Sequence, residues 1–172
     1  PDDKVAPGHA GIESGTTDGT AATYYATIHM LTPSAHPADQ KTAANEPMGM
    51  AYCERIIVYE YSTVLLEMIC RTRGRGWQFF SAPAWFVQGY EEYIGLTCGN
   101  EEAGKVTLGR HIASVKAHPQ WVGCDFGLDV AEPYTAGAVL LHFMHERYGG
   151  ARVRAILFST EPTFGRATRS AL

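Results

Sequence analysis

The sequence has no apolar run long enough to span a membrane and no excess of positive charge. Its 172 residues include 14 Lys and Arg against 18 Asp and Glu, which gives a net charge of −4 at pH 7. A membrane-spanning helix needs about 20 mostly apolar residues, and nucleic-acid binding needs a basic surface that neutralises phosphates. We therefore expect no membrane partner and no nucleic-acid partner.

The four cysteines also lack any C-x-x-C spacing, which argues against a zinc ribbon. Cys98 and Cys124 lie in glycine-containing, loop-like surroundings that suit a disulfide, and secretion into an oxidising compartment would fit such a bond. Cys53 and Cys70 fall in a helical pattern, where cysteine often serves as a small buried apolar residue. The chain begins at Pro1 with no signal peptide, so we expect a processed or trimmed product.

No phosphate-binding glycine loop, Ser-His-Asp or Cys-His motif, internal repeat or low-complexity tract is present. Hydrophobic residues make up 45% and charged residues 19% of the chain, as in ordinary globular domains. The length suits one domain over residues 1–172. Residues 1–20 are rich in Gly, Thr, Asp and Ala without periodicity, and we expect them to form a loose N-terminal segment.

Helices are predicted for most of the chain, after one strand near the N-terminus. Residues 23–31 are rich in aromatic and β-branched side chains, which predicts a strand. Helical patterns that begin at proline or end at glycine or proline follow it. The predicted helices cover residues 50–70, 83–96, 101–117, 133–149 and 151–159. The expected fold class is therefore α+β, mostly α-helical, with a small N-terminal β element.

Three segments carry the functional signal: YEYST at residues 59–63, WFVQGYEEY at 85–93 and PYTAGA at 133–138. Together they resemble the gluzincin metallopeptidases, which include thermolysin-like and aminopeptidase-N-like enzymes, over roughly residues 50–150. In that family an H-E-x-x-H helix supplies two zinc-binding His and a catalytic Glu. A W-x-x-E-G-x-x-E-Y helix supplies the third ligand, and a later Y-x-x-G segment supplies a Tyr that stabilises the oxyanion.

The resemblance implies a role for each matching position. Glu60 matches the catalytic glutamate, Glu92 the second carboxylate of the second helix, and Tyr134 the oxyanion-stabilising tyrosine. The three positions that should hold zinc ligands have other residues: Tyr59, Thr63 and Gln88. The resemblance thus implies a gluzincin-like catalytic domain with a degenerate zinc site.

A phenol, a hydroxyl and an amide are poor zinc ligands, so we expect no metal cofactor. Tyr59 and Thr63 are four residues apart and share one helix face, with Glu60 beside them. Without a divalent ion, burial should raise the pKa of Glu60, which suits a general acid or base near neutral pH. Glu92 is the candidate for the second carboxylate of an acid–base pair.

Other side chains are predicted to contribute hydrogen bonds to a polar ligand. Tyr61 lies beside Glu60 in the helix, and Gln88 offers an amide. His29 lies near the end of the predicted strand, and the resemblance implies that this edge strand lines the substrate cleft. Each of these residues also has a structural reading, since Tyr59 and Tyr61 can be core aromatics and a histidine at a strand end can simply be exposed.

The leading hypothesis is a repurposed, metal-independent enzyme that acts on a small polar ligand or glycan by hydrolysis or proton-transfer cyclisation. Glu60 would be its general acid or base, with Tyr134 and Tyr59 as hydrogen-bond donors. One alternative is an inactive pseudopeptidase that binds a peptide or partner protein along residues 23–31. Another is an active metallopeptidase with unusual ligands, for which His142 and His145 are the nearest candidates.

Overall fold

The computed structural model describes residues 11–13, 27–29, 49–72, 76–77, 81–121 and 132–172. Six helices make up most of these ranges: α1 (Met50–Thr72), α2 (Ala84–Cys98), α3 (Glu101–Ala117), α4 (Glu132–Tyr148), α5 (Gly150–Leu157) and α6 (Phe164–Ala171). Two short strands, β1 (Gly11–Glu13) and β2 (Thr27–His29), pair antiparallel, and one turn of 3₁₀ helix covers Pro119–Trp121.

The predicted fold class, α+β with a small N-terminal β element, is wrong. Throughout the described ranges the architecture is helical, and β1 and β2 have three residues each. A pair this short is no sheet layer, because an independently stable sheet needs three or more strands or an apolar face to bury. The described arrangement does not show a gluzincin fold.

The five predicted helices are confirmed, with bounds that differ by two residues or fewer from those of α1 to α5. Helix α6 was not predicted. It begins after Thr163, whose hydroxyl accepts a hydrogen bond from the Arg166 amide at 3.3 Å and so caps the helix N-terminus.

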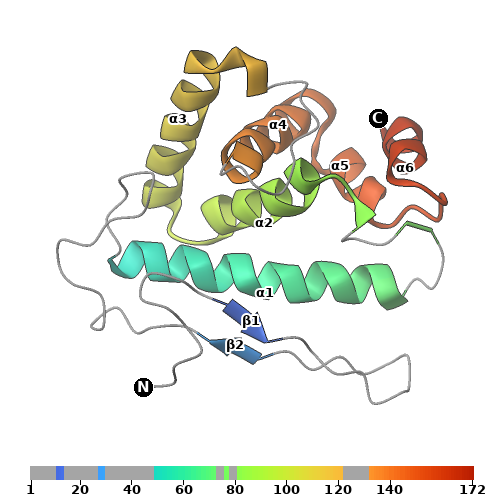
Figure 1. Ribbon diagram of the computed structural model, residues 1–172, viewed down its shortest axis with the longest axis horizontal. Helices are drawn as coiled ribbons and strands as arrows, with labels where there is room; N and C mark the ends of the chain where they lie inside the picture. Colours follow the sequence, from blue (N-terminus) through green and yellow to red (C-terminus); the bar gives the residue numbers. More distant parts are fainter. Residues whose placement is uncertain (1–10, 14–26, 30–48, 73–75, 78–80, 122–131) are drawn as a thin grey trace.

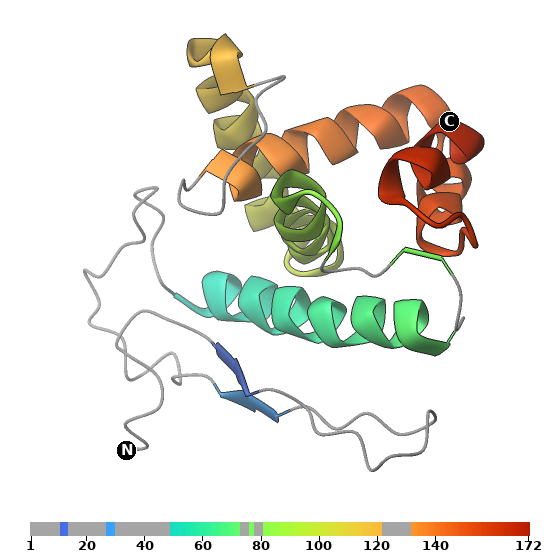
Figure 2. The same cartoon turned by 45° about the vertical axis from the view of Figure 1, so that its right-hand side comes forward.

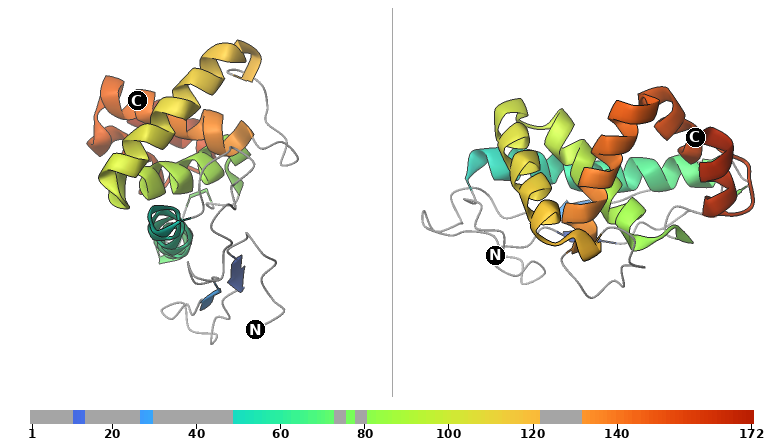
Figure 3. Two further views of the ribbon diagram at one scale, coloured as in Figure 1. Left: turned by 90° about the vertical axis from the view of Figure 1, so that its left-hand side faces the viewer. Right: turned by 90° about the horizontal axis from the view of Figure 1, so that it is seen from above.

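Helix α2 lies at the centre of the bundle and contacts α1, α3 and α4 (Figure 1). Helix α1 runs between the other helices on one side and the β1–β2 pair on the other (Figures 1 and 2). The end-on view of α1 in Figure 3 shows the same order. Helices α5 and α6 pack together at one end, next to the C-terminus. No helix in the described ranges is both long and apolar enough to cross a membrane.

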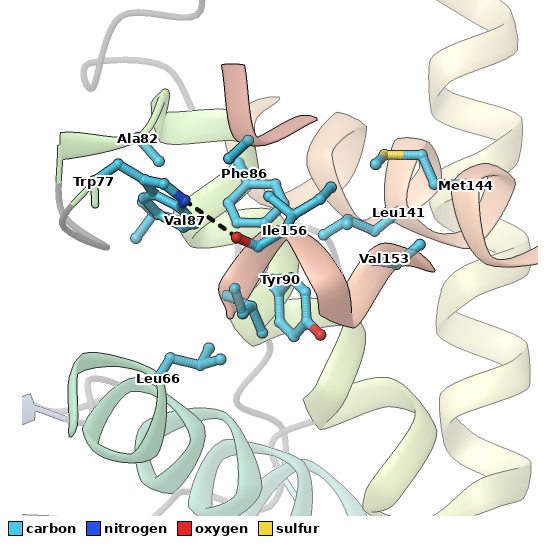
Figure 4. Close-up of a cluster of buried hydrophobic side chains, with 12 residues drawn as sticks. Leu66, Trp77, Ala82, Phe86, Val87, Tyr90, Leu141, Met144, Val153 and Ile156 are labelled. Atoms are coloured by element: carbon cyan, nitrogen blue, oxygen red, sulfur yellow. Dashed lines mark hydrogen bonds between the residues drawn. The ribbon is translucent and has the colours of Figure 1, made fainter. Parts of the chain in front are cut away.

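The main hydrophobic core gathers on one side of α2 (Figure 4). It is centred on Phe86, which is fully buried, and Trp77 closes it by donating from Nε1 to the carbonyl oxygen of Ile156 at 3.1 Å. Its other buried members come from five helices and from the residues just before α2: Leu66, Ala82, Val87, Tyr90, Leu141, Met144, Val153, Leu157 and Ala167. This packing fixes the rotation of α2 about its axis, and Gly95 on another face of the helix lies against Tyr59 of α1.

Helices α2 and α4 cross closely at Gly89 and Gly137, where a Cβ on either residue would overlap the backbone of the other helix. The crossing needs glycine at both positions, because only glycine lets two helix backbones approach this far. It sets the position of the first turn of α4 and, with it, of Tyr134. The arrangement of the candidate site therefore depends on two residues without side chains.

Candidate functional site

Tyr59 is the residue at which helices α1, α2 and α4 meet. Its hydroxyl donates to Gln88 Oε1 on α2 at 2.7 Å. Its ring stacks on that of Tyr134 from α4, with the centroids 6.2 Å apart and the planes inclined by 29°, and the two hydroxyls hydrogen-bond to each other. Two of the three positions that match zinc ligands are therefore in direct contact.

Glu91 lies one turn beyond Gln88 on α2 and is almost entirely buried, with 2% of its surface exposed. The hydroxyls of Tyr59 and Thr63 on α1 lie against its carboxyl group and lower its pKa. Its Oε1 has no hydrogen-bond partner among the described residues. The Thr63 hydroxyl donates to the Tyr59 carbonyl oxygen at 3.4 Å, so Tyr59 is hydrogen-bonded to both of the other ligand-matching positions.

Glu91 itself was missed by sequence reasoning. One signal points to it: its spacing of three from Gln88, which places both side chains on the same helix face. Glu92 is four residues from Gln88 and satisfies the same rule, and the family resemblance favours Glu92. Which of the two adjacent carboxyl groups faces Tyr59 depends on the rotation of α2, which the core on its other side sets.

Glu60 lies beside this cluster with 9% of its surface exposed, and burial raises its pKa above the ordinary value. Burial also raises the pKa of Glu91, to about 7. The Thr63 and Tyr59 hydroxyls oppose that rise, and the negative charge of Glu60 adds to it. Burial therefore shifts both carboxyl groups toward the protonated form.

The two phenols of the site are held neutral. Burial raises the pKa of Tyr59, and the negative charge of Glu91 raises it further. Burial likewise raises the pKa of Tyr134, and the hydrogen bond between the two hydroxyls opposes that rise. A neutral phenol keeps its proton and can donate it in a hydrogen bond. Tyr134 remains 42% exposed, which makes it the most exposed residue of the cluster.

No Lys, Arg or His forms an ion pair with Glu60 or Glu91 in the part of the chain that the structure describes. Two buried carboxyl groups without a counter-charge cannot both ionise at low cost, because burial and mutual repulsion each favour the neutral acid. The absence of a counter-charge therefore favours a proton on one of the two carboxyl groups.

Glu92, the predicted second carboxylate, belongs to a different cluster. Its Oε1 accepts from Arg55 Nη1 of α1 and lies 3.0 Å from His111 Nε2 of α3. All three side chains are buried, so this carboxylate joins three helices through an ion pair. Its negative charge also contributes to the raised pKa of Tyr134. Glu92 therefore has structural partners that differ from those of Glu91.

Two other predicted ligand-binding residues lie apart from the cluster or outside the description. Tyr61 is 56% exposed, because it is two residues from Tyr59 and so points to another side of α1. His29 is the last residue of β2, which contacts α1, and its side chain lies outside what the structure describes. The same holds for Cys124 and the Cys70 side chain, while Cys53 is a buried and Cys98 an exposed free thiol.

The residues at the ligand-matching positions do not fit zinc. Zinc in proteins is bound by imidazole, thiolate or carboxylate groups, whereas Tyr59 is a neutral phenol whose proton is donated to Gln88. Thr63 and Gln88 offer only neutral oxygens. Near His142 and His145, the Tyr93 ring packs against both imidazoles. Among the described residues no three His, Cys, Asp or Glu side chains are grouped so that they could hold a metal.

The free energy of unfolding is expected to fall as the pH rises through the range that Glu91 controls. In the unfolded chain this carboxyl has its ordinary pKa of 4.5, and in the folded protein burial raises the pKa to about 7. Between these values the folded state binds the proton more tightly, so raising the pH favours unfolding. This destabilisation is absent at pH values below the pKa of Glu91 in the unfolded chain. It reaches about 3 kcal/mol at pH values above the pKa of Glu91 in the folded protein.

Urea denaturation at about pH 5 and at about pH 8 measures this dependence. Glu91→Gln should remove most of the difference between the two conditions, because the amide does not ionise. A wild-type protein as stable at the higher pH as at the lower one would contradict the burial of this carboxyl group.

The gluzincin resemblance is carried by the three segments that contain Glu60, Gln88 and Tyr134. The structure brings residues from all three segments into one cluster, although it does not show the fold that the resemblance implies. The catalytic roles that follow from the resemblance remain predictions. No family model, curated protein or solved structure matches this chain.

Proposed function

We propose that this protein is a metal-independent enzyme that performs general acid–base chemistry on a small polar ligand or glycan bound beside Tyr59 and Tyr134. One observation supports this proposal most directly: two buried carboxyl groups, Glu60 and Glu91, share a site with two neutral phenols and have no cationic partner among the described residues. Such a site holds protons that are ready for transfer near neutral pH.

Glu60 is the proposed general acid or base. A carboxyl group whose pKa lies near the working pH can both hold a proton and release it at low cost, which is the condition for efficient acid–base catalysis. Burial moves the pKa of Glu60 in this direction. The sequence adds independent support, because Glu60 stands at the position that matches the catalytic glutamate of the gluzincins.

Tyr134 is the proposed donor to the oxygen on which negative charge develops. The Tyr134 residue is partly exposed to solvent, and burial of its ring raises the pKa of its hydroxyl. The proton therefore stays on the phenol. A fixed hydrogen-bond donor aimed at a developing oxyanion stabilises the transition state more than the ground state. Tyr59 holds Tyr134 in place through ring stacking and the hydrogen bond between the two hydroxyls.

Glu60→Gln tests this proposal. Turnover is measured on a panel of p-nitrophenyl glycosides, p-nitrophenyl esters and peptide p-nitroanilides, with EDTA present throughout. We expect activity on at least one probe that survives the chelator, and a loss of about 100-fold or more in kcat for Glu60→Gln. The matched control is Glu102→Gln, on the exposed face of α3, which should leave kcat unchanged.

Two results would contradict the proposal. Activity that disappears with EDTA and returns with zinc would identify a metallopeptidase with unusual ligands. A probe that binds without turnover, with equal affinity for wild type and Glu60→Gln, would identify a binding protein.

A further inference from the structure

We propose that Glu91 is the second proton-carrying carboxyl group of this site and works as a pair with Glu60. The inference rests on the proposed acid–base function and deepens it, because it assigns the second role to a residue that no sequence motif indicated. It also replaces Glu92 in that role. Glu60 lies in the middle of α1, and Glu91 lies in the middle of α2.

Glu91 lies against two hydroxyl groups of α1. Tyr59 and Thr63 are one turn apart on that helix, and the hydroxyls of both act on the Glu91 carboxyl group to lower its pKa. The same Tyr59 hydroxyl contacts Gln88 on α2 and Tyr134 on α4. Glu91 is thereby fixed at the centre of the cluster, within one hydrogen bond of the donor that we assign to the ligand.

One oxygen of Glu91 has no hydrogen-bond partner. Glu91 Oε1 is buried and without a partner in the described part of the chain, and a buried acceptor left unpaired destabilises the fold. Such an atom requires an explanation, and a catalytic role is one. A carboxylic acid proton on this oxygen, presented to a bound ligand, accounts for the orphaned atom.

The groups that face the pair come from two helices. From α1 come Glu60 and the neutral hydroxyls of Tyr59 and Thr63, and from α4 comes the neutral phenol of Tyr134. Arg55 of α1 is bound to Glu92 together with His111 of α3. Since no positive charge reaches Glu60 or Glu91, the pair keeps one proton where two isolated carboxyl groups would keep none.

In the proposed step the site accepts one proton and gives one proton away. Ionised Glu60 accepts the proton of the attacking hydroxyl or water as the new bond to oxygen forms. Protonated Glu91 gives its proton to the leaving oxygen as the old bond breaks. The site ends with Glu60 protonated and Glu91 ionised, so its proton count is unchanged, and exchange with solvent restores the starting state after the product leaves.

Gln88 also takes part in the proposed proton transfer. Its amide oxygen accepts the Tyr59 proton at 2.7 Å, but a half-turn of the amide would present its NH₂ group to the same hydroxyl. Tyr59 would then be free to donate to the Glu91 carboxylate. Tyr59 can therefore stabilise Glu91 after the proton has left, at the moment when the buried charge is most costly.

The test is an NMR titration of the full chain with isotopically labelled glutamate side-chain carboxyl carbons. We expect one carboxyl resonance that titrates near neutral pH in wild type and in the control Glu102→Gln, and that is absent in Glu91→Gln. In Glu60→Gln the same resonance should titrate at lower pH, because the like charge is gone. A Glu91 carboxyl that titrates in the ordinary range, or at the same pH with and without Glu60, would overturn the pair.

A kinetic measurement separates the pairing from a purely structural role. On any probe that is turned over, kcat of wild type should fall on the alkaline side as Glu91 loses its proton, and Glu91→Gln should lose this limb together with about 100-fold in kcat. An alkaline limb that persists in Glu91→Gln would overturn the proposal. If no probe is turned over, the enzyme function fails while the titration still decides whether Glu60 and Glu91 share a proton.

Discussion

Replacing Gly89 with alanine is expected to lower the free energy of unfolding by about 3 kcal/mol. A Cβ at this position would overlap the Gly137 backbone on α4. Backbone atoms cannot rotate out of the way as a flexible side chain can, so α2 and α4 must move apart and lose packing along their whole crossing. The substitution removes no contact that the wild-type protein makes, which makes it a direct test of the helix spacing.

The control for this prediction is Gly109→Ala on α3, where an added Cβ meets nothing within 4 Å. Alanine favours a helix over glycine by about 1 kcal/mol, so this variant should be slightly more stable than wild type. Urea denaturation of the two variants measures the contrast. Equal stabilisation by both substitutions would mean that α2 and α4 do not cross closely at Gly89.

The Gly89 variant should also weaken the candidate site. Gly89 is adjacent to Gln88 in the chain, and the displaced α4 carries Tyr134. A shift of α4 away from α2 would separate the Tyr134 ring from Tyr59, on which it stacks. Loss of turnover in a Gly89→Ala protein that is still folded would link the glycine crossing to the chemistry.

Glu92→Gln is expected to cost about 3–5 kcal/mol of stability. The substitution leaves the buried Arg55 guanidinium without its carboxylate partner, and the contact to His111 Nε2 at 3.0 Å is weakened as well. An unpaired buried charge is far more costly than an exposed one, because the interior cannot solvate it. The three residues lie on α1, α3 and α2. The loss of stability should therefore appear as cooperative unfolding of the three helices.

Glu102→Gln is again the matched control, because it breaks an exposed pair with Lys105, and such pairs contribute about 1 kcal/mol or less. The double variant Arg55→Met with Glu92→Leu should recover much of the loss, since it removes both charges together. If Glu92→Gln were as stable as the control but inactive, the catalytic role that the resemblance assigns to Glu92 would be favoured instead.

The helices could be predicted well because their signals are local. Proline at the start of the second helix, proline after the third and glycine after the fourth each mark a boundary through residues next to it in sequence. The structure adds a cap at the start of the third helix, where Asn100 accepts a hydrogen bond from the Ala103 amide at 3.1 Å. The strand prediction was less informative, because pairing joins distant residues and its extent cannot be read from one segment alone.

The content of the site could be predicted only in part. The family pattern predicts that Tyr59, Thr63 and Gln88 belong together, and in the structure Tyr59 is hydrogen-bonded to both of the others. That Glu91 rather than Glu92 faces Tyr59 did not follow, because adjacent residues on a helix point about 100° apart. A small change in the rotation of α2 would exchange their environments.

The sequence alone determined which segments of this protein are helical, which polar residues lie at helical spacing on α1 and α2, and that no zinc-binding set stands at the three ligand-matching positions. Only the tertiary structure decided which carboxyl group is paired with Arg55 and which is left without a cation. The reason is that the ionisation of a carboxyl group depends on burial and on neighbours from other helices. Packing around Phe86 and the glycine crossing of α2 and α4 brings those neighbours together.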